Sequence, residues 1–180
     1  LLKMLSYVIK KFNQNKIRYW IDFSGLLALI RRQNLAEMSD VDISINLCDV
    51  KKVYKILKNN KNFYSFPKFY YQISNYPKFV SGLKKNKKLK QTIMFIVGNV
   101  NPQIIEPPMI DFIYKKITKK KVINVQKNEY LPLKYFRSFD LVKYKGLVLR
   151  TPKNSTQYLR YLYGKSWKKQ AEFWSPLKKE

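Results

Sequence analysis

The sequence predicts an α+β fold in which helices flank a mixed central β-sheet. Of the 180 residues, 46% are hydrophobic and 16% aromatic, which is far more than a disordered chain carries. Apolar residues recur at helical spacing near both ends, while the middle holds runs of β-branched and aromatic residues. The length, with no linker and no internal repeat, indicates a single domain over residues 1–180.

The first third of the chain is expected to alternate between helices and strands. Leu5, Val8 and Phe12 fall on one face of a first helix, and Asp49 is suited to cap a third one. The expected elements are a helix at 1–15, a strand at 17–23, a short apolar helix at 26–32, a strand at 41–47 and a helix from Asp49 to about residue 59.

The rest of the chain is expected to be rich in strands. The nearly continuous apolar run at 92–97 predicts a strand buried on both faces. The expected elements are strands at 63–73, 79–83, 92–97, 109–114 and 121–125, a hairpin around 143–146 and a helix from about Ser155 that stops at Gly164.

The reactive side chains are few, and this narrows the possible chemistry. The chain has no His, which excludes a Ser-His-Asp triad and a His-ligated zinc site. Cys48 is the only cysteine, so an internal disulfide and a multi-cysteine metal site are excluded too. Any metal must be held by oxygen ligands, which suits Mg²⁺ or Mn²⁺.

The net charge of +26 points first to nucleic acid or an anionic membrane. Six of the 37 basic residues are Arg, which leaves 31 Lys scattered along the chain in short clusters. A solvated lysine-rich surface is therefore the preferred interpretation over a dedicated polyanion groove, and nucleic acid is an unlikely but possible partner.

No apolar stretch reaches the roughly 18 residues of a membrane span. The chain opens at Leu1 without an initiator Met, which is typical of a truncated start, so an upstream anchor or targeting segment stays possible. Localisation and oligomeric state are left open by the sequence.

Two aspartates separated by one residue are the main candidate site. Alternate residues of a strand share a face, so Asp40 and Asp42 are expected to project together. Neighbouring carboxylates repel each other, and a divalent cation between them relieves this cost. Upstream, Ser24 and Gly25 stand where a strand gives way to a helix, and their N–H groups are expected to cradle a phosphate.

The order of these elements resembles that of the LicD/fukutin family. That family carries a Gly-Ser/Thr-Leu-Leu-Gly-x-x-Arg segment, an Asp-x-Asp strand and a Tyr-Gly-x-x-Trp ending. Residues 24–28 with Arg31 match the first element, Asp40 to Ile43 the second, and Tyr163 to Trp167 the third. Ala28 replaces the usual second Gly, and Glu37, Met38 and Ser39 stand where the family often has a Trp and a further acidic residue.

The resemblance implies a nucleotidyltransferase-like fold and a metal-dependent phosphotransferase. Relatives move phosphocholine or ribitol phosphate from a CDP-linked donor to a glycan or lipopolysaccharide-type acceptor. It implies that Mg²⁺ or Mn²⁺ bridges Asp40, Asp42 and the donor pyrophosphate, and that Ser24, Gly25 and Arg31 bind the donor. A third carboxylate usually comes from a neighbouring strand, and Asp111 is the candidate, as metal ligand or as general base. Bacterial relatives act in the cytoplasm or at the membrane periphery, whereas eukaryotic ones are anchored in the Golgi and the secretory pathway.

Several assignments stay open at this stage. Arg31 either contacts donor phosphate or pairs with Glu37. Asp22 is interpreted as an exposed turn residue rather than a site residue, and Cys48 as core or edge packing. Tyr163 and Trp167 are expected to seal the last helix against the sheet rather than to stack on a base. Two other functions compete: a nucleotidyltransferase acting on nucleic acid or protein, and a catalytically degenerate binding module.

Overall fold

A computed structural model describes residues 1–38, 40–57, 64–68, 94–98, 109–125, 127 and 129–169. The α-helices within these ranges are α1 (Leu2–Gln14), α2 (Phe23–Ile30), α3 (Val50–Leu57) and α6 (Ser155–Tyr163). The strands are β1 (Tyr19–Ile21), β2 (Asp40–Asn46), β3 (Tyr64–Lys68), β4 (Met94–Gly98), β5 (Met109–Ile117), β6 (Val122–Asn124), β7 (Glu129–Leu131), β8 (Phe139–Tyr144) and β9 (Leu147–Pro152). Short 3₁₀ turns lie at Leu35–Glu37, Leu47–Asp49, Leu133–Tyr135 and Lys165–Lys168.

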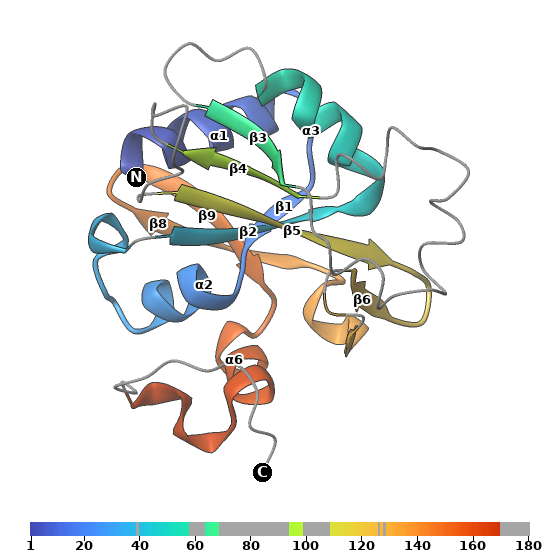
Figure 1. Ribbon diagram of the computed structural model, residues 1–180. Coiled ribbons are helices and arrows are strands. Elements are labelled where there is room, and N and C mark those ends of the chain that lie inside the picture. Colours follow the sequence, from blue (N-terminus) through green and yellow to red (C-terminus); the bar gives the residue numbers. More distant parts are fainter. Residues whose placement is uncertain are drawn as a thin grey trace.

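The described strands form one mixed sheet and one separate hairpin (Figure 1). The sheet runs in the order β1-β2-β5-β4-β3, and β6 and β7 continue from β5. Strands β2 and β5 are parallel, whereas the other pairs are antiparallel. The hairpin of β8 and β9 lies against β1, where the Trp20 ring contacts Phe139 at 5.1 Å and Phe136 at 5.4 Å between ring centroids. The coarse prediction of helices around a mixed sheet is confirmed.

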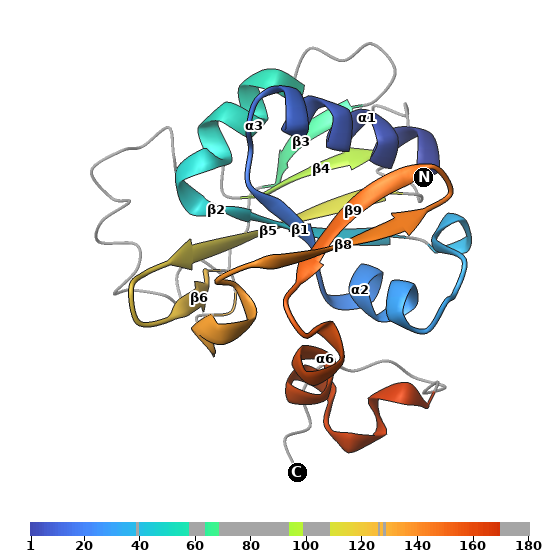
Figure 2. The same ribbon diagram turned by 180° about the vertical axis from the view of Figure 1, so that it is seen from behind.

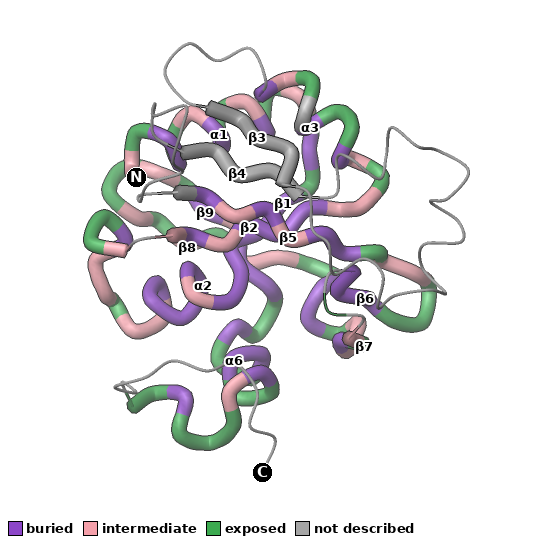
Figure 3. The backbone as a smooth tube through the Cα atoms, in the orientation of Figure 1, coloured by how far each residue is buried: buried purple, intermediate pink, exposed green. Residues whose placement is uncertain are grey.

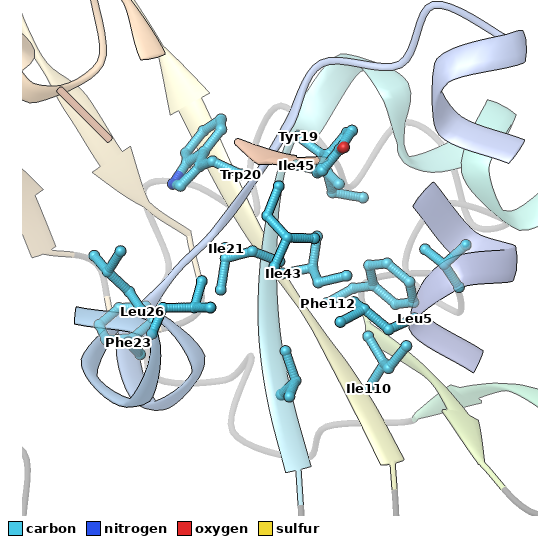
Figure 4. Close-up of a cluster of buried hydrophobic side chains, with 14 of the residues drawn as sticks. Leu5, Tyr19, Trp20, Ile21, Phe23, Leu26, Ile43, Ile45, Ile110 and Phe112 are labelled. Carbon is cyan, nitrogen blue, oxygen red and sulfur yellow. The ribbon is translucent and has the colours of Figure 1, made fainter. Parts of the chain in front are cut away.

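Helices cover both faces of the sheet (Figures 1 and 2). On one face α1 packs through Phe12, whose ring lies 5.5 Å from Tyr19 and 5.8 Å from Phe112. Figure 4 shows Tyr19 and Trp20 on opposite sides of β1, as expected for neighbours on a strand. On the other face lie α2 and α6. Buried and half-buried residues run along β1, β2 and β5 in the middle of the molecule (Figure 3).

Most predicted elements of the described residues are found, with shifted ends. Helix α2 begins at Phe23, three residues before the predicted start, because the Asp22 side chain accepts a hydrogen bond from the Phe23 N–H and so caps the helix. Gly164 ends α6 with a φ of 76°, a conformation that suits glycine. The predicted strand at 79–83 and the outer parts of those at 63–73 and 92–97 lie outside the described residues, as does the burial of the 92–97 run.

Within the described part of the chain, no helix is both long and apolar enough to cross a membrane.

Candidate metal centre

Three aspartates converge at the start of the two central parallel strands. Asp40 and Asp42 alternate along β2 and therefore share a face, as predicted. Asp111 of β5 lies directly opposite Asp42 in the parallel register. Each of the three side chains offers a carboxylate oxygen, and these oxygens all lie within 4.8 Å of one another. All three residues are half-buried, so the cluster is both gathered and reachable from solvent.

This donor set suits a hard divalent ion. Each Mg–O bond is about 2.1 Å, so adjacent oxygens of an octahedral Mg²⁺ site are about 3.0 Å apart and opposite ones about 4.2 Å. Three ligands include at most one opposite pair, so the three carboxylate oxygens draw closer together when they share one ion. Mg²⁺ and Mn²⁺ both prefer carboxylate oxygens, and the cluster has no nitrogen or sulfur ligand that would favour a softer metal.

Asp42 is the most constrained member of the cluster. Its Oδ2 accepts hydrogen bonds from the Ser24 N–H at 3.1 Å and from the Ser24 hydroxyl at 2.5 Å. Burial, together with the nearby charges of Asp40 and Asp111, raises the pKa of Asp42 to about 7 despite the lowering effect of Ser24. A bound cation would favour the ionised form of this carboxylate instead.

Ser24 and Gly25 lie in the first turn of α2. The sequence assigns their backbone N–H groups to a phosphate, and that contact stays a prediction. In the structure the Ser24 N–H and the Ser24 hydroxyl both donate to Asp42. Gly25 instead permits close packing, since a Cβ there would lie 3.0 Å from the side chains of Ile21 and Val41. The lack of a side chain lets α2 approach β1 and β2 closely enough for Ser24 to reach Asp42.

Arg31 lies at the other end of α2, and the structure directs it elsewhere. Its guanidinium donates to the backbone carbonyls of Trp167 and Lys169 after α6. Neither ion pair of the described residues joins Arg31 to Glu37. Glu37 accepts a hydrogen bond from Asn34 instead. The structure therefore does not bring Arg31 into the acidic cluster, and its contact with the donor stays a prediction.

Tyr163 is the last residue of α6, and Trp167 lies in the 3₁₀ turn that follows. Trp167 is buried, which agrees with the predicted sealing role. Tyr163 is half-buried, and its pKa is raised by burial and by the charges of Asp22 and Asp42, so its phenol lies within electrostatic range of both.

Cys48 is exposed, so the prediction of core or edge packing is wrong.

The sequence interpretation of Asp22 is also wrong. Asp22 is fully buried and accepts hydrogen bonds from three side chains and one backbone N–H. It also pairs with Lys115, a residue that sequence reasoning missed. One signal was available: Lys115 follows Asp111 and Ile113 at alternate positions of a strand, so it shares the face of the candidate site. With 31 lysines in the chain, this position does not distinguish Lys115 from the others.

No protein-family model matches this chain, and no curated protein matches it.

Proposed function

We propose that this protein is a metal-dependent transferase of the LicD/fukutin type. It moves a phospho-group, such as phosphocholine or a polyol phosphate, from a CDP-linked donor to a hydroxyl of a glycan. The observation that carries the proposal is the convergence of Asp40, Asp42 and Asp111, three carboxylates from two adjacent parallel strands. The mixed sheet flanked by helices is compatible with a nucleotidyltransferase-like fold.

The residues of the cluster take separate parts in this proposal. Asp40 and Asp42 hold the ion, and Ser24 fixes the orientation of the Asp42 carboxylate through two hydrogen bonds. Asp111 either completes the ligand set or accepts the proton of the acceptor hydroxyl. When bound, the ion supplies positive charge that neutralises the pyrophosphate as CMP leaves.

The main competitor is transfer of a nucleotide to nucleic acid or protein, which the charge of +26 favours. The two reactions differ in their donor, because one uses CDP-linked alcohols and the other uses nucleoside triphosphates. A degenerate binding module would use neither donor.

Two assays with Mn²⁺ separate these functions: labelled CDP-choline or CDP-ribitol with an acceptor glycan, and labelled nucleoside triphosphates with nucleic acid or protein as acceptor. We expect release of CMP from a CDP-linked donor, and a loss of at least about 100-fold in Asp40→Asn and Asp42→Asn, since each change removes a metal ligand. Asp140→Asn is the matched control: it makes the same chemical change at a surface carboxylate paired with Lys153. Turnover of triphosphates alone would overturn the proposal, as would wild-type turnover in both cluster variants.

A further inference from the structure

A fourth carboxylate, that of Asp22, lies next to the acidic cluster, and the proposed chemistry does not use it. Asp22 connects the end of β1 to four other elements of the fold. Its partners are the Trp20 indole N–H at 3.1 Å, the Phe23 N–H at 2.9 Å, the Ser44 hydroxyl at 2.6 Å, the Tyr158 hydroxyl at 3.0 Å and the Lys115 ammonium at 3.5 Å. One carboxylate thus joins β1, α2, β2, β5 and α6.

Lys115 is the unusual member of this group. Its side chain is fully buried, with the ammonium 4.4 Å from the centre of the Phe23 ring. Burial lowers its pKa, while the charges of Asp22 and Asp42 oppose this effect. Removing two charges from water is costly, and a buried ion pair is poor evidence for a stabilising role by itself. A buried pair in this position therefore calls for an explanation beyond stability.

The pair is linked to the acidic cluster through the backbone. The Asp22 N–H donates to the carbonyl of Asp42 at 3.0 Å, and Ser44 lies two residues after Asp42 on the same face of β2. Lys115 lies four residues after Asp111 on the same face of β5. Each strand that supplies a carboxylate to the cluster therefore also supplies a partner to Asp22.

The turn between Asp22 and Ser24 is strained. Phe23 has a φ of 39°, in the left-handed region that bulky residues rarely occupy. Such a conformation persists only where the surroundings hold it. Here the Asp22 carboxylate accepts the Phe23 N–H, and the Phe23 ring covers the Lys115 ammonium. The next residue, Ser24, is thereby aimed at Asp42.

We propose that Asp22 and Lys115 are positioning residues of the metal centre. Their buried pair locks the strained turn at Phe23, and that turn directs both donors of Ser24 onto the carboxylate of Asp42. The inference rests on the proposed function, since it assumes that the acidic cluster binds an ion. Lys115 does not reach substrate, because its side chain is fully buried. Its effect on the ion is transmitted through Asp22, Phe23 and Ser24.

Mn²⁺ binding to the full chain, measured by titration calorimetry and by the Mn²⁺ electron paramagnetic resonance spectrum, tests this inference. We expect Lys115→Met to bind Mn²⁺ about 10- to 100-fold more weakly, the range typical for residues that orient metal ligands. Tyr158→Phe and Ser44→Ala each remove one hydrogen bond to Asp22 and keep the charges, so they are expected to weaken binding several-fold. These two variants decide the question if Lys115→Met does not fold.

Two controls separate positioning from general stability. Tyr135→Phe removes a hydroxyl from a ring that lies 5.2 Å from Tyr158, and Phe12→Leu destabilises the core on the opposite face of the sheet. Both are expected to bind Mn²⁺ like the wild type. If the wild type does not bind Mn²⁺, the proposed function fails. If the wild type binds and the variants at Lys115, Tyr158 and Ser44 match it, the positioning role alone is overturned.

Discussion

The single carboxylate of Asp22 and the cluster of Asp40, Asp42 and Asp111 lie close together on one face of the sheet, and their surroundings are opposite in kind. Asp22 is fully buried and receives four hydrogen bonds and one ammonium from the protein itself. Asp40, Asp42 and Asp111 are half-buried and lie against one another, so that repulsion within the group contributes to the raised pKa of Asp42. Protein donors therefore compensate the negative charge of Asp22, whereas the three carboxylates of the cluster bring negative charges close together.

The difference separates a structural carboxylate from a candidate ligand. A carboxylate that is saturated with protein donors has no lone pairs left for an ion. Carboxylates that lie against one another repel each other, and an ion that binds between them stabilises the fold. The same residue type thus serves packing at Asp22 and forms the candidate site at Asp40, Asp42 and Asp111.

The largest expected effect is that of Asp22→Asn on stability. This change leaves the buried Lys115 ammonium without its counter-charge, which costs about 3–5 kcal/mol for a broken buried pair. Asp140→Asn makes the same change at a surface pair and is expected to cost less than about 1 kcal/mol. Urea unfolding of the two variants measures the contrast. If both variants lost the same free energy of unfolding, the buried pair of Asp22 would matter no more to stability than the surface pair of Asp140.

The next effect concerns Asp42 and depends on pH. Between about pH 4 and the pKa of about 7, folded Asp42 holds a proton that the unfolded chain releases, so its contribution to stability falls as the pH rises. Asn does not ionise, so Asp42→Asn is expected to gain stability over the wild type across this window, reaching about 2–4 kcal/mol at pH 8, since one pKa unit is worth about 1.4 kcal/mol.

Unfolding in EDTA at pH 5 and pH 8 measures this gain. Added Mn²⁺ is expected to stabilise the wild type and to leave Asp42→Asn unchanged. A difference between the two proteins that stays constant from pH 5 to pH 8 would contradict the raised pKa of Asp42.

The smallest expected effect is that of Gly25→Ala in α2, the helix that begins beside Asp22 and carries Ser24 to Asp42. Gly25→Ala places a Cβ 3.0 Å from the side chains of Ile21 and Val41, which pushes the helix away from the sheet and costs about 1–3 kcal/mol. The shift is expected to weaken Mn²⁺ binding as well, because Ser24 moves with the helix. Thermal unfolding and Mn²⁺ titration of the variant test both effects. A stable variant with full Mn²⁺ affinity would show that close approach of α2 is not required.

The sequence predicts the elements better than it predicts their ends and contacts. Apolar periodicity predicts α1 and α6, because each buries one face against the rest of the molecule. The predicted start of α2 is wrong because Ser24 and Gly25 resemble a turn at the end of the strand, whereas the helix begins before them at a cap made by Asp22. Its cap depends on a buried network whose other members stand up to 136 residues away, and local patterns do not show such contacts.

The sequence likewise predicts the local features of the candidate site better than its contacts between distant residues. Alternation along a strand is a local property, so the shared face of Asp40 and Asp42 followed from the sequence. The position of Asp111 opposite Asp42 required a choice of neighbouring strand, which the family resemblance suggested and the register shows. Arg31 contacts carbonyls that lie 136 and 138 residues further along, which no local pattern indicates. The metal-binding role of the cluster stays a prediction.

The parallel pairing of β2 with β5 has a consequence for biosynthesis. Asp42 and Asp111 are neighbours in space but 69 positions apart in the chain, so a nascent polypeptide exposes the first long before the second is made. Joining distant segments is entropically costly and slow compared with forming local helices. If the acidic cluster binds a cation, a newly made chain therefore binds it only after β2 has paired with β5.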